Sequence, residues 1–553
     1  MCTTMIFGRK ATADRSLIVT HSDDDELSDQ RVVRVPAMDH EPGAMRDVFA
    51  EFYDYPRIVS KDRGPGYDTP GWPETKAIGQ IPQVQHTFAY YDGNYGIINE
   101  HGLMMGECTN GAKYQPAYVT AADAGEGKTP RLFYSSELSR IALERCRTAR
   151  EAIKVMGELI DTYGYYSSGE TLLVADDTEG WVFEMCALPS DRHNSAWIAQ
   201  RVPDDEMFCA ANTFRIREVP SATYEQIHPP YLHEALEELG WWDPAKGALD
   251  WLPAISEGEY NHPYYSLRRI WRVFDRVNPD LALSPWVEGT YTNQYPFSIK
   301  PRAPLDVRQI FDLYRDHYEG TEFDLTKGTA AGPYGDPHRF TGGYDGAQNS
   351  TAPRMAHGAW ERAISVFYQG YTFVLQNRPD VADCAKSVMW FAPDVSYTSV
   401  FAPFYAKAAD LPKAYQTGNT REYDRGAAWW VFDFVANWSR LNFQRMTKVD
   451  ILPLQKELEA KLIASLAECD ESLAGDPATA PDLMAAFSQK ATDELLDRWR
   501  ALGDMLIAKY SDGYVNPPPN DRRDPAEIGY SADWLRRTDY SEGPVTYEMK
   551  VRN

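Results

Sequence analysis

Residues 2–25 of this 553-residue chain read CTTMIFGRKATADRSLIVTHSDDD. Two short β-prone runs, 3–10 and 16–22, are joined by the turn-like segment 11–15. Apolar and β-branched runs joined by a short polar connection predict a β-hairpin. This hairpin carries a cysteine at its beginning and an acidic cluster at its end.

Cys2 stands directly behind Met1, and cysteine is small enough for a methionine aminopeptidase to remove the methionine before it. The mature chain would then begin with a residue that holds both a thiol and a free α-amine. A thiol with a pKa near 8.5 is only a few per cent thiolate at pH 7, and an α-amine with a pKa of about 7.7–8.0 can act as its base. Cys2 is therefore a candidate nucleophile, unless its position is incidental.

The composition excludes several classes of protein. Hydrophobic residues make up 43% of the chain and aromatic residues 13%, which is enough for a sizeable core. The net charge of −25 argues against nucleic-acid binding. We see no run of about 18 apolar residues that would cross a membrane. The beginning of the chain also lacks the apolar stretch of a signal peptide, which favours the cytoplasm.

The seven cysteines are scattered, with no CxxC pair that would indicate a zinc or redox site. Cys108, Cys186 and Cys209 lie in apolar, strand-like runs and are expected to be inert core thiols. The acidic segment 21–29 lacks the glycine and the closing glutamate of a calcium loop. We therefore expect no metal and no organic cofactor.

A run of strands, then a pair of helices, then further strands predicts a layered α+β fold with helices stacked on antiparallel sheet for the first part of the chain. Strand-like runs occupy 32–36, 86–92, 95–100 and 102–109, and after the helices 170–177, 180–187, 195–202 and 206–214. Between them lie two predicted helices. The first, 135–146, opens with a serine and glutamate arrangement suited to N-capping, and the second, 148–164, stops at Gly164.

The second half of the chain has a different composition. Residues from about 220 to 350 are rich in Pro, Gly, Tyr and Trp, with helices expected at 264–275 and 304–318 and a loop at 326–353. Strands are expected again around 363–369 and 386–393. After about 420 the pattern is helical, and a Pro-rich segment closes the chain.

Several stretches, in order along the chain, resemble the PepD-type dipeptidases and secernin-like proteins, which are N-terminal-nucleophile (Ntn) cysteine hydrolases. They are CTTMIFGRKATADRS (2–16), INEHGLMMGECTNG (98–111), LLVADDTEGWVFEMCA (172–187), FCAANTFRIRE (208–218), YYSLRRIWR (264–272) and SVFAPFYAKAADLP (399–412). The resemblance implies a four-layer αββα sandwich with a mainly helical C-terminal part. It further implies a catalytic domain at 2–420 (with the insertion at about 220–350), a packed helical extension at 421–515 and a Pro-rich tail at 516–553.

The resemblance also implies roles for residues of the hairpin. Cys2 matches the nucleophile. Asp24, three residues beyond His21, matches an Arg-x-x-Asp step whose aspartate orients the amine and the thiol, and Asp23 is its rival by register. His21 stands where many relatives have arginine, so the thiolate would lack a permanently charged partner. A solvated loop carboxylate is the other interpretation of Asp24.

Further matches concern the oxyanion of an acyl-transfer intermediate, which requires hydrogen-bond donors. Asn212 matches the oxyanion asparagine, although an ordinary turn capping its strand is an alternative. Thr109 or Asn110 falls near a second donor. Arg269 matches an arginine near the nucleophile in the acylase branch. Because Arg268 and Arg272 are its neighbours, an exposed helix face is an alternative for each of these arginines.

The resemblance implies a cysteine-type dipeptidase that forms a thioester acyl-enzyme and hydrolyses short, unblocked peptides. A buried carboxylate near the nucleophile would bind the substrate ammonium, with Asp23, Asp25 and Glu107 as candidates and a solvated acidic rim as the alternative. The rival functions are an N-acyl amidase of the penicillin V acylase or bile salt hydrolase type and a catalytically silent secernin-like binding protein. A carbohydrate-binding aromatic surface is a further alternative. No nucleic-acid or membrane partner is expected, and a homo-oligomer stays open.

Overall fold

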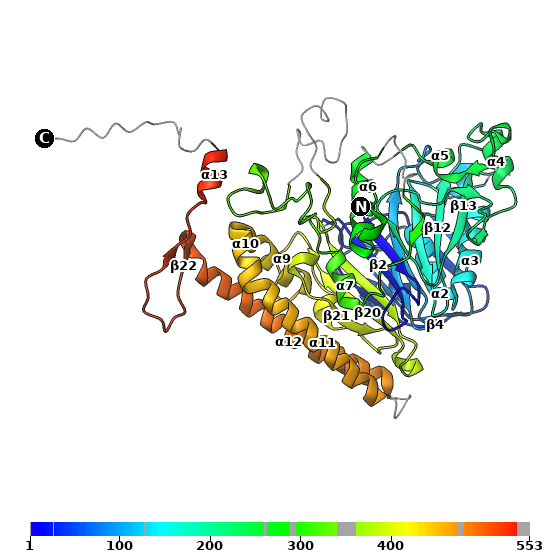
Figure 1. Cartoon of the computed structure of the whole chain (residues 1–553). Coiled ribbons are helices and arrows are strands. Elements are labelled where there is room, and N and C mark those ends of the chain that lie inside the picture. Colours follow the sequence, from blue (N-terminus) through cyan, green and yellow to red (C-terminus); the bar gives the residue numbers. More distant parts are fainter. Residues whose placement is uncertain are drawn as a thin grey trace.

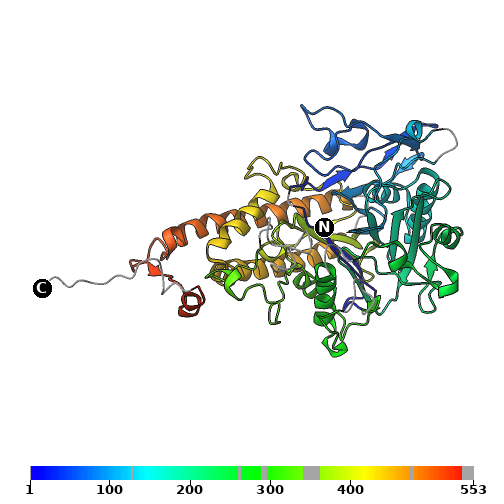
Figure 2. The ribbon, with the colours of Figure 1, turned by 90° about the horizontal axis from the view of Figure 1, so that it is seen from above.

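The computed structural model describes residues 2–25, 27–125, 129–258, 263–287, 295–339, 361–473 and 479–538. Over these residues the chain forms antiparallel sheets with helices packed around them, an α+β fold (Figure 1). The long C-terminal helices lie along one side of the sheets and project beyond them, as the view from above also shows (Figure 2). The predicted fold class is confirmed at this level.

The predicted hairpin forms the centre of a seven-stranded sheet, which we call the nucleophile sheet. Its strands run in the order β18-β14-β1-β2-β19-β20-β21. Their bounds are β1 Cys2–Phe7, β2 Leu17–Asp23, β14 Met207–Ala210, β18 Ser298–Ile299, β19 Tyr371–Asn377, β20 Ser387–Pro393 and β21 Ala402–Tyr405. The nucleophile strand β1 therefore has a neighbour on each side.

An eight-stranded sheet, which we call the facing sheet, packs against the nucleophile sheet. Its strands run in the order β16-β13-β12-β11-β10-β9-β8-β3. Their bounds are β3 Val33–Val35, β8 Tyr90–Asp92, β9 Gly96–Asn99, β10 Met104–Asn110, β11 Gly169–Ala175, β12 Gly180–Ala187, β13 Ser195–Val202 and β16 Gln226–Ile227. Strands β10 and β11 lie against β1 and β2.

Gly106 on β10 allows the two sheets to approach each other closely. A Cβ atom at this position would lie 2.8 Å from Thr4 Oγ1 and 3.2 Å from the carbonyl oxygen of Thr20. Only glycine avoids these contacts without a shift of the sheets. The residue that follows, Glu107, thereby lies close to Cys2.

Two helices cover the outer face of the facing sheet. They are α2 (Ser135–Arg145) and α3 (Ala149–Tyr163), and their apolar residues form a core with the outward side chains of that sheet. Helix α3 begins with a capping box between Thr148 and Glu151 and ends at Gly164, as expected. The expected serine cap of α2 is wrong. Its N-cap is Tyr134, and Glu137 binds arginines instead of the helix end.

The C-terminal helices pack on the far strands of the nucleophile sheet (Figures 1 and 2). The longest, α12 (Ala480–Lys509), contacts α9 (Ala428–Ser439), α11 (Leu452–Leu473) and β21. The helical pattern expected after about 420 is confirmed. Among the described helices, none combines the length and apolar character needed to cross a lipid bilayer.

The remaining elements are mostly short, except for α6 (Pro263–Val277), which packs on β14. The other helices are α1 Ala121–Ala124, α4 Leu232–Glu238, α5 Trp251–Ile255, α7 Val307–Leu313, α10 Phe443–Met446 and α13 Ala532–Arg537. The strands are β4 Met38–Asp39, β5 Met45–Val48, β6 Gly79–Pro82, β7 His86–Thr87, β15 Glu218–Val219, β17 Leu249–Asp250, β22 Tyr514–Val515 and β23 Ala526–Glu527.

Two expected elements of the second half are wrong. The strand expected at 363–369 does not form, because β2 ends at Asp23, which pairs with Tyr371, so the preceding residues have no strand beside them. The helix expected at 304–318 is limited to 307–313, and Tyr318 has a left-handed φ of 65°. Parts of the insertion, of the loop at 326–353 and of the tail lie outside the described residues.

Candidate active site

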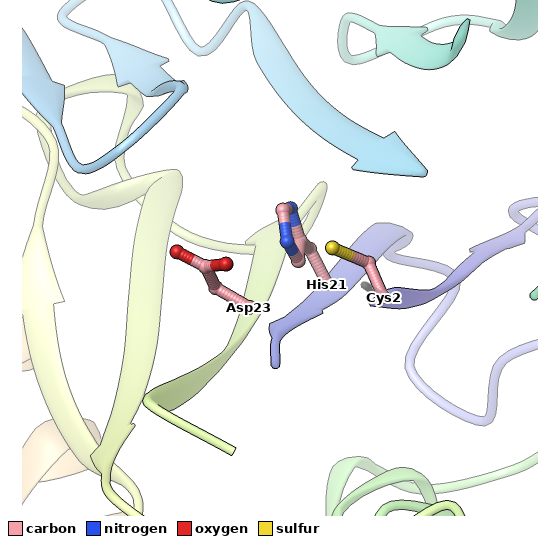
Figure 3. A group of neighbouring side chains, drawn as sticks. All are labelled: Cys2, His21 and Asp23. Atoms are coloured by element: carbon pink, nitrogen blue, oxygen red, sulfur yellow. The ribbon is translucent and has the colours of Figure 1, made fainter. Parts of the chain in front are cut away.

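The hairpin register brings Cys2 next to the acidic end of β2. Cys2 pairs with Asp23 across the two strands, and Thr4 pairs with His21. The side chains of Cys2, His21 and Asp23 converge, with ligand-type atoms within 4.8 Å of one another (Figure 3). Three ligand-type atoms at this spacing could also hold a metal ion.

Glu107 is the carboxylate in contact with the thiol. Cys2 Sγ donates to Glu107 Oε2 at 3.1 Å, and the hydroxyl of Thr109 donates to Glu107 Oε1 at 2.9 Å. Both Cys2 and Glu107 are buried, which overturns the interpretation of Glu107 as a solvated rim residue. Burial and the neighbouring Glu107 carboxylate raise the pKa of the Cys2 thiol, so the resting thiol is protonated.

His21 is buried beneath this contact and is neutral near pH 7. The backbone N–H of Glu107 donates to His21 Nδ1 at 3.2 Å, which places the proton of the neutral ring on Nε2. The Nε2 atom lies 3.7 Å from Glu107 Oε2. Burial lowers the pKa of His21 to about 4, although Glu107 and Asp24 oppose this shift. Because this position holds a histidine where many relatives have arginine, it carries no charge near pH 7.

The acidic cluster divides among three environments. The carboxylate of Asp23 lies beside Cys2 and accepts from Asn94 Nδ2 at 2.5 Å, and burial raises its pKa to about 7. Asp24 is also buried and forms an ion pair with Arg362 at 2.5 Å. A solvated Asp24 is therefore wrong. Asp25 lies in the turn after β2, where its carboxylate accepts from the backbone of Leu27.

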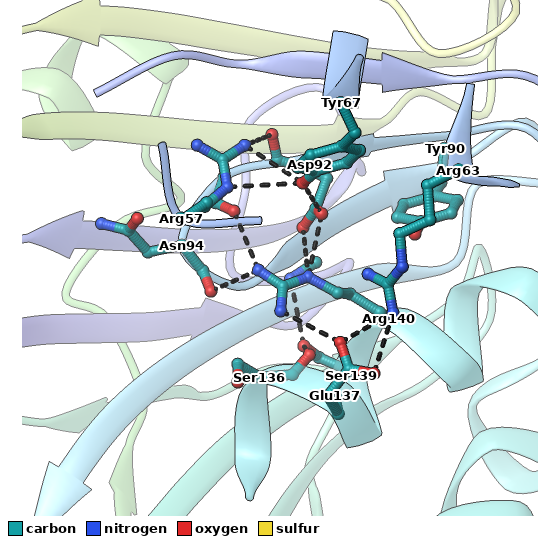
Figure 4. A network of polar contacts seen from close by, with 12 residues as sticks. Arg57, Arg63, Tyr67, Tyr90, Asp92, Asn94, Ser136, Glu137, Ser139 and Arg140 are labelled. Carbon is teal, nitrogen blue, oxygen red and sulfur yellow. Dashed lines mark hydrogen bonds and ion pairs between the residues drawn. The ribbon is translucent and has the colours of Figure 1, made fainter. Parts of the chain in front are cut away.

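A buried polar network holds the loop that carries Asn94 (Figure 4). Arg140 on α2 donates to the carbonyl oxygen of Asn94 at 2.8 Å and forms an ion pair with Asp92 at 2.8 Å. Asp92 also accepts from the hydroxyl of Tyr67. The network therefore fixes the position of the amide that binds Asp23.

Asn212 follows the end of β14, the strand that flanks β1. Its backbone has a left-handed φ of 61°, a conformation that asparagine tolerates better than most residues. The backbone N–H donates to Cys108 Sγ at 2.7 Å, and the side-chain Nδ2 donates to the carbonyl oxygen of Thr109 at 2.8 Å. A primary amide has a second N–H on the same nitrogen.

Arg269 on α6 connects Cys2 to Asn212. Its Nη1 donates to the carbonyl oxygen of Cys2 at 2.8 Å, and its Nη2 donates to Asn212 Oδ1 at 2.9 Å. Because Oδ1 is held by the guanidinium, the orientation of the Asn212 amide is fixed. The exposed-face alternative is wrong for Arg269 and its neighbours Arg268 and Arg272, all of which are buried.

The two candidates for a second oxyanion donor have different contacts. The hydroxyl of Thr109 binds Glu107, and its carbonyl oxygen binds Asn212. Asn110 Nδ2 donates a hydrogen bond to Thr171 Oγ1 at 2.7 Å. Of the two residues, Thr109 contacts both Glu107 and Asn212.

The sequence reasoning missed three residues of this site. Asn94 and Arg362 come from loops and carry no local signal that would link them to the hairpin. Glu170 does carry one, since it lies in the buried strand β11 on the same side as Leu172 and Val174. A glutamate on an otherwise apolar strand face indicates a functional or paired carboxylate.

Comparisons with known proteins give a consistent result. A sequence model of peptidase family C69 matches residues 1–455. A probable dipeptidase of Salmonella dublin is 25% identical over 410 residues, which are 73% of this chain and 80% of that protein. Probable dipeptidase B of Lactococcus lactis is 23% identical, with 91% and 95% covered, and dipeptidase A of Lactobacillus helveticus is 22% identical, with 83% and 85% covered.

Proposed function

The chain belongs to peptidase family C69, and from this premise we propose that it is a dipeptidase whose nucleophile is Cys2, exposed as the first residue once Met1 is removed. The relatives named as dipeptidases support the substrate class. The convergence of Cys2, Asp23 and His21 in a buried cluster supports the position of the nucleophile.

The proposed reaction is acyl transfer through a thioester. The α-amine of Cys2 takes the thiol proton as Sγ attacks the scissile carbonyl carbon, and a C–S bond forms. The tetrahedral intermediate collapses when the C–N bond breaks and the amine passes its proton to the leaving nitrogen. Water then attacks the thioester, releases the acid and restores the thiol. We propose that Asp23 or Asp24 orients the amine.

The second N–H of Asn212 Nδ2 is the proposed oxyanion donor, with Thr109 or Asn110 as a further one. Such donors act where negative charge develops, and they are effective because they are already oriented. The observation that carries the proposal is the position of Arg269, which holds both the Cys2 carbonyl oxygen and Asn212 Oδ1. One side chain thereby sets the nucleophile strand against the proposed donor.

At the level of the fold, we propose that the two packed sheets and their helices form the αββα sandwich of the Ntn hydrolases. The proposed catalytic domain is 2–420, with the insertion at about 220–350. Residues 421–515 form the proposed helical extension, and 516–553 form the tail. Contacts of α12 and α11 with β21 support a packed extension.

A comparison of three substrates tests the proposed function. The values of kcat/KM are measured for L-Ala-L-Ala, for its N-acetyl form and for an N-acyl amide such as a bile-salt conjugate. We expect hydrolysis of the unblocked dipeptide and a large loss on acetylation. Preference for the acylated substrates would instead support the amidase alternative, and no hydrolysis of any of them would support a binding protein.

A further inference from the structure

Glu107, which contacts the thiol, and its neighbour Glu170 differ from other buried carboxylates of the described chain in the groups that compensate their charge. Burying a carboxylate is costly unless a cation or several hydrogen-bond donors compensate its charge. Glu184 is compensated by N–H donors from Arg215, Ile216 and Trp251, and several other buried carboxylates are compensated by arginines. The pairs are Glu137 with Arg46, Arg63 and Arg140, Asp29 with Arg31 and Arg57, Asp24 with Arg362, Asp316 with Arg272, and Glu459 with Arg315.

Glu170 and Glu107 have no described arginine partner, and each has the other glutamate as a neighbour. Glu170 pairs with Thr109 across β10 and β11, and Glu107 pairs with Leu172, so both glutamates lie on the same side of these strands. Glu170 lies diagonally opposite Glu107, a position from which long side chains on neighbouring strands can reach each other. Both side chains are fully buried.

One oxygen atom of Glu170 has no described donor. The hydroxyl of Tyr134 donates to Oε1, whereas Oε2 receives no hydrogen bond from any described residue. The charged neighbours that most affect Glu170 are carboxylates, Glu107 first and Glu51 after it. A buried, negatively charged site of this kind requires a compensating cation. No side chain in the described part of the chain supplies one.

The chemistry of an unblocked dipeptide supplies that cation at a fixed place. Its α-ammonium is carried by the carbon bonded to the scissile carbonyl carbon, which Sγ must approach to about 3–3.5 Å before it attacks. The ammonium must therefore lie very close to the thiol. Glu107 Oε2, at 3.1 Å from Cys2 Sγ, is in that position, and Glu170 is its diagonal neighbour on the adjacent strand β11.

We propose that Glu170 and Glu107 together form the subsite that binds the free α-ammonium of the substrate, with Glu170 as a specificity-determining residue. This inference rests on the proposed dipeptidase function and names residues for its substrate class. The ammonium donates hydrogen bonds to both carboxyl groups, including the free Oε2 atom of Glu170.

In the empty subsite the two carboxyl groups share one proton. Burial and the Glu107 carboxylate raise the pKa of Glu170 well above its usual range, so it holds this proton at pH 7. When the ammonium binds, the proton leaves to solvent. The net charge of the subsite is −1 before binding and −1 afterwards, because one ammonium replaces one proton. A neutral N-acetyl group cannot make this exchange.

Other groups that titrate or carry charge face this pair from the surrounding elements, and an experiment on proton release must consider them. A group whose pKa lies far from 7 neither gains nor loses a proton near pH 7. The set comprises Cys2 on β1, His21 and Asp23 on β2, Cys108 on β10, Tyr134 on α2, and Glu51, Tyr53, Tyr95 and Tyr165 on loops. Burial lowers the pKa of His21 and raises those of the others, and among them Asp23, with a pKa of about 7, is the group whose titration the N-acetyl control must account for.

The first test substitutes Glu170→Gln, which keeps an oxygen acceptor for Tyr134 and removes the charge. Glu184→Gln is the matched control, because Glu184 is a buried glutamate on the adjacent strand β12 that binds the backbone of Arg215 and Trp251 Nε1. We expect Glu170→Gln to raise the KM for L-Ala-L-Ala about 10- to 100-fold, the worth of a charge-assisted hydrogen bond. Glu184→Gln should leave the ratio between L-Ala-L-Ala and its N-acetyl form unchanged.

The second test measures the proton directly and does not depend on the folding of a Glu170 variant. Cys2→Ala enzyme is titrated with L-Ala-L-Ala at pH 7 in phosphate and in Tris, and the difference in binding enthalpy gives the protons released. We expect about one proton per dipeptide bound, since linkage requires release when the proton competes with the ligand. N-acetyl-L-Ala-L-Ala is the control, and it should release none.

The outcomes separate this inference from the proposed function. Dipeptide binding without proton release would overturn the inference, as would a Glu170→Gln enzyme with wild-type KM and wild-type discrimination, even though the protein is a dipeptidase. If the wild-type protein hydrolyses no dipeptide, or if Cys2→Ala remains fully active, the proposed function itself is wrong.

Discussion

The thiol of Cys2 donates a hydrogen bond to the carboxylate of Glu107, with 3.1 Å between Sγ and Oε2. A negative charge at this distance favours the protonated thiol, and burial acts in the same direction. The resting site is therefore not a preformed thiolate. Reactivity requires a base for the thiol proton and a cation that offsets Glu107, and the proposed substrate brings such a cation.

Substitution of the nucleophile gives the first prediction. Cys2→Ala should abolish dipeptide hydrolysis, because no other described thiol lies in this cluster, while the fold remains intact. The measurement is turnover of L-Ala-L-Ala together with the circular dichroism spectrum and the melting temperature. Turnover at the wild-type rate by a folded Cys2→Ala protein would assign the reaction to another residue.

Asn212→Ala tests the proposed oxyanion donor. Loss of one such donor typically costs about 2.7–4 kcal/mol of barrier, which is a factor of about 100 to 1,000 in kcat. We expect KM to change much less than kcat. If instead the melting temperature collapses and the residual folded enzyme has normal kcat, Asn212 acts only as the turn residue after β14.

Arg269→Lys tests the link between Cys2 and Asn212. Lysine keeps the positive charge, but a single ammonium cannot hold both the Cys2 carbonyl oxygen and Asn212 Oδ1 as the guanidinium does. We expect kcat to fall while KM stays near the wild-type value, since Arg269 is proposed to act through Cys2 and Asn212. An unchanged kcat in the lysine variant would show that the fork geometry is dispensable.

The pH dependence of the reaction distinguishes Asp23 from Asp24. Burial raises the pKa of Asp23 to about 7, so its carboxylate form, which is the form that could orient the Cys2 amine, is populated as the pH rises through this value. We expect kcat/KM to increase across that range in the wild type. Asp23→Asn should remove this acid limb together with most of the activity, and should change the melting temperature little.

Asp24→Asn is the matched variant for that comparison. It removes one partner of the buried ion pair with Arg362, a change that typically costs about 3–5 kcal/mol of stability. We therefore expect a lower melting temperature and a retained acid limb. The reverse pattern, with the limb lost only in Asp24→Asn, would make Asp24 the residue that orients the amine.

Much of the nucleophile region could be predicted from local sequence. The hairpin forms because its two β-prone runs are close in the chain, and the structure pairs Cys2 with Asp23 across the connection at 8–16. The strand containing Gly106 and Glu107 was also recognisable from its apolar pattern. These features depend on neighbours in the chain, which a single sequence contains.

The remaining contacts depend on tertiary packing. Arg362 lies more than 300 residues beyond Asp24, and nothing in its surroundings indicates this partner. The serine and glutamate pattern at 135–137 was misleading, because in the folded chain Glu137 pairs with arginines and does not cap the helix. The sequence could not show which of Asp23 and Asp24 lies beside Cys2. Adjacent side chains on a strand point to opposite faces, so the answer depends on the residue at which β2 ends.

The central claim is that Cys2 attacks as the first residue of the mature chain. Its most direct test is top-down mass spectrometry of enzyme that is acid-quenched during turnover of L-Ala-L-Ala. We predict an N-terminal fragment that begins at Cys2 and carries an alanyl group on that residue. Full-rate turnover by chains that still retain Met1, or an acyl group found on a different residue, would contradict the account.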